Sequence, residues 1–223
     1  MESYMFDKMK QLPFLQGMSV AEFDSILKFM KLDFKTYNEG DCIVHQGDKA
    51  DNLIYVIDGK FEAEHQDMLN SFAISEISTA SPYLIEPHNL FSIQRRYDRT
   101  YSFLTRGSTF TISKDFFTSR LLDHKLIRSN LINHLCNELS KMQSRVRFSL
   151  SADIEQRIAD FIRSYTTMKN AETHLHISMD TLACLTDETR LNVSKVLNKW
   201  NDQGIIILKR LYFIVPDTSL LPK

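Results

Sequence analysis

The sequence contains few cysteines, and they lie far apart. Cys42, Cys136 and Cys184 form neither a CxxC pair nor a set of four ligands. A zinc or iron–sulfur site built from cysteines alone is therefore not expected. An odd number of scattered cysteines indicates reduced side chains that are mostly buried.

Long hydrophobic runs are also missing. No run approaches the roughly eighteen apolar residues of a membrane-spanning helix. Residues 1–7 lack the basic and apolar regions of an export signal. We therefore expect no membrane partner and a cytoplasmic location.

Motifs for catalysis are missing as well. The sequence has no Ser/His/Asp arrangement with a supporting motif, no P-loop and no histidine–glutamate set at metal-binding spacing. We therefore predict that the protein is not an enzyme and has neither a catalytic residue nor a metal site.

A strong net charge is absent, because 27 Lys/Arg nearly balance 28 Asp/Glu. The local balance is different near the C-terminus, where residues 189–210 contain five Lys/Arg and one Asp. Phosphate binding depends on local positive charge. This segment can therefore contact nucleic acid even in a nearly neutral protein.

Residues 1–113 predict a β-rich domain. Ser19 and Glu22 form a capping box at the start of an early helix. The hydrophobic period then changes to two, and glycines separate short runs that are typical of strands. These runs are 42–44, 53–57, 61–64, 72–77, 101–105 and 109–113. Many short strands with close turns predict a β-barrel or jelly roll, so the expected fold class is α+β.

Residues 114–149 have no glycine or proline and predict a long helix. Its apolar residues step by 3, 4, 3 and 4, which is a coiled-coil seam over about two heptads. They are Ile132, Leu135, Leu139, Met142 and Val146. A core helix within one subunit has the same short pattern. We favour a dimerisation helix, because the segment is long and lies between two domains.

Residues 150–223 begin with a predicted helix over 154–165, for which Ser151 is the expected cap. Two short helices follow, and Thr189 can cap the second, which Gly204 ends. The apolar stripe of that second helix is Val193, Val196, Leu197 and Trp200. Residues 205–215 predict a hairpin with a basic tip. Two short helices joined by a tight turn and followed by a hairpin are typical of a winged helix-turn-helix that binds DNA.

The order of these parts resembles that of the Crp/Fnr family of transcription regulators over nearly the whole chain. Residues 37–48 (YNEGDCIVHQGD) and 53–61 (LIYVIDGKF) are similar to the glycine-punctuated strands of its sensor domain. Residues 189–197 (TRLNVSKVL) are similar to its recognition helix, often written SRExVxRxL. The resemblance implies a cyclic-nucleotide-binding-like sensor domain over 1–113, a dimerisation helix over 114–149 and a winged helix-turn-helix over 150–223. It also implies a homodimer on a pseudo-palindromic operator, with double-stranded DNA and RNA polymerase as partners.

The resemblance assigns roles to residues of the recognition helix. Arg190 matches the family's guanine-reading arginine, and arginine bound to guanine O6 and N7 is the commonest specific base contact. Lys195 matches a second cation, and Thr189 and Asn192 match positions that contact phosphate. Leu191 departs from the pattern, because the family usually has a glutamate there that accepts from a cytosine amine. Leucine can instead pack on a thymine methyl group. The other expected DNA contacts are Lys199, Lys209 and Arg210.

The expected effector site is less well matched. Cyclic-nucleotide-binding relatives carry a Gly-Glu pair for the ribose and an Arg-Ser/Thr-Ala segment for the cyclic phosphate. The best matches here are His88-Asn89 and Arg99-Thr100-Tyr101. Only the arginine and the hydroxyl remain, so cyclic AMP is not the expected effector. The segment is either a structural turn, with Arg99 paired to a carboxylate such as Asp98 or Glu86, or a site for another, unknown small anionic effector.

Other sensing modes of the family stay open. The N-terminal cysteine cluster of its iron–sulfur branch is absent, which disfavours that branch. Haem needs only one or two axial ligands, which His45, His65, His88 or methionine residues could supply. A haem, redox or nitrosative-stress sensor of the same fold is therefore one alternative. A ligand-binding module that has lost DNA binding is another, and the cationic helix and hairpin tip argue against it.

Overall fold

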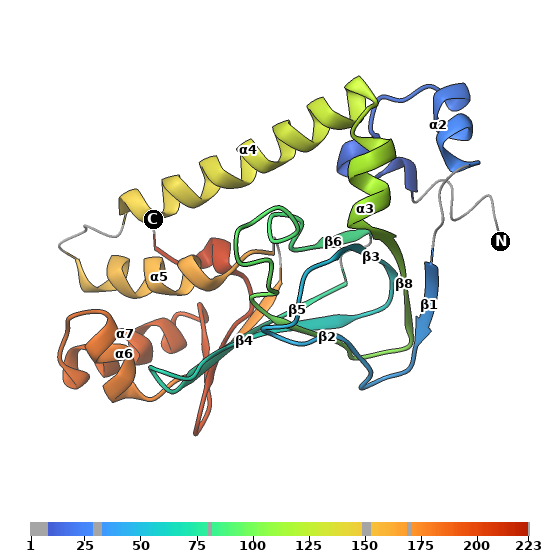
Figure 1. Cartoon of the computed structure of the whole chain (residues 1–223). Coiled ribbons are helices and arrows are strands. Elements are labelled where there is room, and N and C mark those ends of the chain that lie inside the picture. The colour runs from blue at the N-terminus through green and yellow to red at the C-terminus, as the bar shows by residue number, and fades with distance from the viewer. Residues whose placement is uncertain (1–8, 29–32, 80–81, 149–152, 169–170, 223) are drawn as a thin grey trace. The chain divides into compact units, whose positions relative to one another are not determined.

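The computed structural model describes residues 9–28, 33–79, 82–148, 153–168 and 171–222, and of residues 141–148 it describes the backbone alone (Figure 1). Contacts divide the chain into two compact units. The first consists of Met1–Phe61, Thr79–Asp98 and Ser102–Leu139, and the second of Glu62–Ser78, Arg99–Tyr101 and Ser140–Lys223. The second unit therefore combines the C-terminal region with a hairpin from the N-terminal region. The contiguous division at 113 and 149 stays a prediction, and residue 149 lies outside the described residues.

The first unit contains a four-stranded antiparallel sheet. Its strand order is β1 (Asp33–Tyr37), β8 (Gly107–Ser113), β3 (Asn52–Asp58) and β6 (Tyr83–Ile85). Strand β3 is central, and five consecutive residues of it are buried. Tyr55 of β3 stacks on Phe110 of β8 with ring centroids 4.7 Å apart. The rings of Phe14 and Tyr55 form a T-shaped pair with centroids 5.6 Å apart, which is a favourable aromatic geometry.

Two further strands of the N-terminal region are β2 (Cys42–Val44) and β7 (Thr100–Phe103). Backbone hydrogen bonds join β7 to the two residues just before β2, since Phe103 donates to Asp41 at 3.0 Å and accepts from Gly40 at 2.8 Å. Together with β3, β8 and the strands β4 (Phe61–Asp67) and β5 (Phe72–Ser78), these two strands confirm all six predicted strand runs, and β1 and β6 are additional. The mixed helix and strand class is confirmed as well. The four-stranded sheet keeps β1 and β6 as edges, so the structure does not close it into a barrel.

The helices of the first unit pack on this sheet. A 3-10 turn η1 (Pro13–Leu15) precedes α2 (Val20–Leu27), and the predicted capping box of Ser19 and Glu22 is present. The segment predicted as one long helix is instead interrupted. It forms α3 (Lys114–Phe116), a π-helical turn η2 (Phe117–Leu121) and then α4 (Lys125–Phe148), of which the residues up to Leu139 belong to the first unit. Phe117 and Leu121 are buried in the core of this unit, which holds the turn in place.

The second unit is built around Trp200. Its helices are α5 (Ile154–Tyr165), α6 (Met179–Leu185) and α7 (Arg190–Asp202). Its strands are β4 (Phe61–Asp67), β5 (Phe72–Ser78), β9 (Glu172–His176), β10 (Ile207–Leu208) and β11 (Phe213–Val215), and a 3-10 turn η3 (Thr218–Leu220) follows. The strand order is β10-β11-β9-β5-β4. Ile158 and Ile162 of α5 are buried against Val193 and Trp200 of α7 in one core. The predicted helices and the hairpin are confirmed, whereas β9 was not predicted.

Two local expectations need correction or fall outside the structure. None of the three cysteines forms a disulfide bond, but Cys136 and Cys184 are exposed and Cys42 is partly buried, so the prediction of mostly buried cysteines was wrong. The reason is that α4 and α6 bury the opposite faces, which carry residues such as Ile127 and Leu182. The predicted cap Ser151 lies outside the described residues, and Asp153 caps α5 in the structure.

Candidate nucleic-acid interface and effector region

A four-residue turn joins α6 to α7, and both helices are capped. The Ser178 hydroxyl accepts from the Thr181 N–H at 3.0 Å at the start of α6. The Thr189 hydroxyl accepts from the Asn192 N–H at 3.3 Å at the start of α7. Each cap satisfies one of the free donors of a first helical turn. The two helices pack against each other, as in a helix-turn-helix (Figure 1).

The turn itself has a left-handed residue at its centre. The Glu188 N–H donates to the Ala183 carbonyl at 2.8 Å, and the Asp187 N–H donates to the Cys184 carbonyl at 3.3 Å. These two bonds define a Schellman motif, in which the residue after the helix cap adopts positive φ. That residue is Asp187, with φ of 51°. Glycine is usual at this position because a Cβ is strained there.

Helix α7 buries one face and presents the other to solvent. Its four apolar stripe residues, Val193, Val196, Leu197 and Trp200, are all buried. Arg190, with 70% of its side chain exposed, lies 3.6 Å from a carboxylate oxygen of the equally exposed Asp180. Exposed pairs of this kind contribute little stability, so the arginine can leave Asp180 for another partner. Leu191 is 65% exposed, so this leucine does not pack in the hydrophobic core of the unit.

The acidic residue of the turn is held by a cation. Glu188 forms an ion pair with Arg157 of α5, and the Arg157 Nε also donates to the Thr186 carbonyl at 3.1 Å. The Asn192 side-chain amide donates to the other oxygen of Glu188 at 3.2 Å. The turn is thereby tied to α5, and the negative charge beside the first turn of α7 is compensated.

The two lysines of α7 are in different situations. Lys195 is exposed and has no ion-pair partner among the described residues. Lys199 donates to an Oε of Glu155 at 2.5 Å, and the Trp200 indole donates to the other oxygen at 3.2 Å. The hydrogen bond from Lys199 lowers the pKa of Glu155 below its usual value of 4.5. Lys195 therefore offers an available charge, and Lys199 one that is already compensated.

The hairpin after α7 has an exposed basic tip. The Lys209 N–H donates to the Tyr212 carbonyl at 2.9 Å, which closes the tip. Lys209 and Arg210 are exposed, as the sequence predicts for a wing. The Tyr212 ring stacks on two histidines of β9, His176 at 4.8 Å and His174 at 5.9 Å. Sequence reasoning missed this support, because β9 itself was not predicted.

Two of the predicted effector residues, His88 and Asn89, lie in a polar cluster of the first unit. The Asn89 amide donates to Glu86 at 2.7 Å and to Asp98 at 3.2 Å. The Asp98 backbone N–H donates to the same Glu86 oxygen at 2.7 Å. Burial raises the pKa of Glu86, and the hydrogen bond to Asp98 raises the pKa of His88. A ligand at Asn89 would therefore lie beside two carboxyl groups, which is an unfavourable place for an anion.

The other two predicted effector residues, Arg99 and Thr100, belong to the second unit, at the start of β7. Arg99 is only 6% exposed. Its Nη1 donates to an oxygen of Glu76 at 2.5 Å, and its Nη2 donates to the Tyr165 carbonyl. Sequence reasoning foresaw a carboxylate partner for Arg99 but missed Glu76, because the two residues are 23 positions apart and no local pattern links them.

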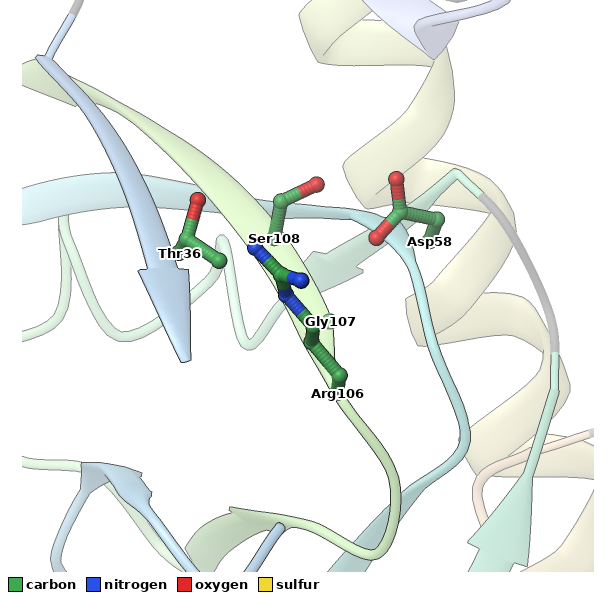
Figure 2. Close-up of a pocket in the computed structure, with 5 residues that line it drawn as sticks. All are labelled: Thr36, Asp58, Arg106, Gly107 and Ser108. Carbon is green, nitrogen blue, oxygen red and sulfur yellow. The ribbon is translucent and has the colours of Figure 1, made fainter. Parts of the chain in front are cut away.

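A surface hollow of about 310 Å³ lies in the first unit. Figure 2 shows the residues that line it, which come from β1, the end of β3, the start of β8 and the residue before β8. They are Thr36, Asp58, Arg106, Gly107 and Ser108. The lining contains no large apolar side chain, and Thr36 and Arg106 are exposed. Ligand sites are usually mostly apolar and enclosed, so this hollow supports no binding function.

The described residues contain no group of three or more His, Cys, Asp or Glu arranged to hold a metal ion. None of the helices in the described part of the chain is long and apolar enough to cross a membrane.

Helix α4 presents part of the predicted seam to solvent. Ile132 is 53% exposed and Leu139 is 56% exposed, and they are one heptad apart on the same face. Leu135 is different, because it packs against the core of the first unit. The side chains of Met142 and Val146 lie outside the described residues.

Comparison with known proteins identifies the fold. No protein-family model and no curated protein matches the sequence. Among solved structures, the catabolite activator protein of Thermus thermophilus matches with a TM-score of 0.52 and 18% identity, over 94% of this chain and 96% of that one. A transcriptional regulator from Eubacterium rectale, assigned to the Crp/Fnr family, matches with a TM-score of 0.52 and 17% identity, over 94% of this chain and 96% of that one. The c-di-GMP responsive global regulator CLP of Xanthomonas campestris matches with a TM-score of 0.51 and 19% identity, over 86% of this chain and 98% of that one. The chain therefore has the fold of the Crp/Fnr transcriptional regulators.

Proposed function

We propose that the protein is a DNA-binding transcription regulator of the Crp/Fnr type, which acts as a homodimer on a pseudo-palindromic operator. The observation that carries this proposal is the outer face of α7. A capped, well-packed helix presents Arg190, Leu191 and Lys195 to solvent, and the hairpin that follows it in sequence has a basic tip. The N-terminal residues of a recognition helix are those that contact base edges in the major groove.

Dimerisation would use α4. Ile132 and Leu139 are exposed apolar side chains on one face of a 24-residue helix. Pairing this face with the same face of a second copy would remove both side chains from water. The two copies of α7 would then have to lie about 34 Å apart to meet successive turns of the major groove. A change in the β-strands of the first unit would regulate DNA binding by altering how the two α4 helices pack.

The effector in this proposal is not cyclic AMP. The two residues that match the ribose-binding pair, His88 and Asn89, lie with Glu86 and Asp98 rather than in an anion-binding environment. The arginine that matches the phosphate-binding residue is engaged with Glu76. RNA polymerase is the proposed partner at the promoter.

A binding experiment tests the proposal. Operators are first selected from a random duplex library, and the best sequence is then titrated at several salt concentrations. We expect an affinity that falls as salt rises, because the protein displaces counterions from phosphates. Failure to enrich any sequence, or an affinity independent of salt, would instead point to a ligand-binding module without DNA binding.

The role of Arg190 is tested with the same operator. Arg190→Ala should lose about 1–3 kcal/mol of discrimination at one base pair of each half-site. Arg120→Ala is the matched control, since Arg120 is an exposed arginine on η2 of the first unit. An unchanged sequence preference in Arg190→Ala would contradict the assignment.

A further inference from the structure

The β4–β5 hairpin is part of the same sheet as the wing. Strand β5 pairs with β9 over five residues, from Ala73 opposite His176 to Ile77 opposite Glu172. Strand β9 pairs in turn with β11 of the wing hairpin. A hairpin from the N-terminal half of the sequence thus continues the sheet that carries the basic tip (Figure 1).

Glu76 of β5 holds the segment that follows α5. Its carboxylate is completely buried. It accepts from the Thr167 N–H at 2.9 Å, the Thr167 hydroxyl at 2.9 Å and the Met168 N–H at 2.8 Å. The two N–H groups are the first backbone donors beyond the cap of α5, Thr166. One carboxylate therefore fixes the path by which the chain leaves α5.

Arg99 completes this arrangement from the other side. Its guanidinium donates to Glu76 and also to the carbonyl of Tyr165, the last residue of α5. A cation at a helix C-terminus interacts favourably with the helix dipole. Glu76 and Arg99 together therefore clamp the end of α5, one through N–H groups and the other through a carbonyl.

The clamped helix is the one that supports the recognition helix. Arg157 of α5 forms an ion pair with Glu188 in the turn before α7. Glu155 of α5 accepts hydrogen bonds from Lys199 and Trp200, which lie near the C-terminal end of α7. Buried ion pairs often contribute little net stability, whereas removal of one partner is costly. A pair of this kind is better suited to fixing a geometry than to adding stability.

We propose that Glu76 and Arg99 are positioning residues for DNA binding. By clamping the end of α5 to the β4–β5 hairpin, they set α7 and the wing in one fixed arrangement. Arg99 then has a role within the DNA-binding unit, which differs from the effector contact that the sequence resemblance implies. The DNA-binding part of this inference rests on the proposed function, whereas the clamp itself can be tested without DNA.

The first test measures amide hydrogen exchange in the free, full-length protein. Arg99→Met and Glu76→Gln should each accelerate exchange at Thr167 and Met168 by about tenfold or more, because charged hydrogen bonds are lost. Arg106→Met is the matched control, since Arg106 is exposed in the first unit. If Arg99→Met does not fold, Arg99→Lys replaces it, because lysine keeps the charge but cannot reach both partners. Unchanged exchange in the folded variant would overturn the clamp.

The second test asks whether the clamp positions the wing on DNA. Arg210→Ala and Arg190→Ala are each combined with Arg99→Lys, and binding to the selected operator is measured. We expect Arg210→Ala to lose most of its effect in the Arg99→Lys background, whereas Arg190→Ala keeps its effect. General destabilisation would not alter one contact selectively. Equal effects in both backgrounds would overturn the positioning role, and absence of wild-type DNA binding would overturn the proposed function while leaving the exchange result valid.

Discussion

The ammonium group of Lys199 lies 2.5 Å from a carboxylate oxygen of Glu155, across the packed faces of α7 and α5. The same carboxylate accepts from the indole of Trp200, the largest buried side chain of this unit. Glu155 therefore compensates the charge of Lys199 and also fixes the orientation of the buried Trp200 indole. This relationship separates Lys199, whose charge is compensated within the unit, from Arg190 and Lys195, whose exposed charges are available for the proposed contact with DNA.

Lys195 and Lys199 should differ in their effects on DNA binding. Lys195→Ala should reduce the salt dependence of binding by about one unit of slope, as expected for loss of one phosphate contact. Lys199→Ala should change the slope less, because its charge is compensated by Glu155. Binding titrations at several salt concentrations measure both slopes. Equal slopes for the two variants would show that DNA draws Lys199 away from Glu155.

The same pair predicts an acid-dependent loss of stability. The hydrogen bond from Lys199 lowers the pKa of Glu155 in the folded protein below 4.5. Its stabilising contribution is therefore complete above that usual value and is lost as the pH falls through the lowered one. Glu155→Gln should be less stable than wild type at neutral pH, and the difference should shrink between pH 5 and pH 3, values that bracket roughly the usual carboxyl range. Chemical denaturation across this range checks it, and a difference that grows toward acid would contradict the sign.

Asp187 predicts a stabilising substitution in the helix-turn-helix. Its φ of 51° is strained for a residue with a Cβ. Asp187→Gly should raise the free energy of unfolding by about 1 kcal/mol, because glycine adopts this conformation without the steric cost. Asp187→Ala is the control and should not stabilise, since alanine tolerates the left-handed region less well than aspartate. Thermal unfolding measures both, and equal effects would show that the turn relaxes.

The exposed seam on α4 predicts a dimer that a single charge disrupts. Ile132→Glu or Leu139→Glu should shift the protein toward monomer, because a carboxylate would be buried in an apolar contact. Asn133→Glu is the matched control on the same helix, where the native side chain is exposed and polar. Leu135 is a poorer test site, since it packs in the core of the first unit. Sedimentation velocity gives the oligomeric state, and a monomeric wild type would contradict the proposed interface.

Features set by nearby residues could be predicted from the sequence. The capping box of Ser19 and Glu22, the cap at Thr189 and the stripe ending at Trp200 all follow from spacing over one or two helical turns, and the structure contains each of them. The interrupted segment before α4 was not foreseen. Its break comes from burial of Phe117 and Leu121 in a core assembled from distant strands, which overrides a locally uniform helical pattern.

Features set by distant residues could not be predicted. Strand β9 is short and contains two histidines, and it is held by pairing to β5 and β11, which lie far away in sequence. The partner of Arg99 has the same origin, since Glu76 reaches it only because β5 joins this sheet. The expected effector pocket was carried over from a family motif. That motif cannot indicate which carboxylates surround the residues that replaced it.

The remaining prediction concerns the base pair that Leu191 would face in the proposed complex with DNA. Its side chain is 65% exposed beside Arg190, at the position where the family pattern has glutamate. A leucine contacts a thymine methyl group, whereas a glutamate accepts from a cytosine amine. Leu191→Glu should therefore change the selected operator at one base pair of each half-site, from thymine toward cytosine, by about 1–3 kcal/mol.

Leu191→Ala separates this readout from simple loss of contact. It should weaken the thymine preference without creating a cytosine preference, because alanine offers a smaller apolar contact and no acceptor. Selection from a duplex library randomised at that base pair measures all three proteins in parallel. Position 191 is exposed and lies off the buried stripe of α7, so both substitutions should leave folding intact. An operator preference that is the same in wild type and Leu191→Glu would place Leu191 outside the DNA contact and would require the docking of α7 in the groove to be rotated away from it.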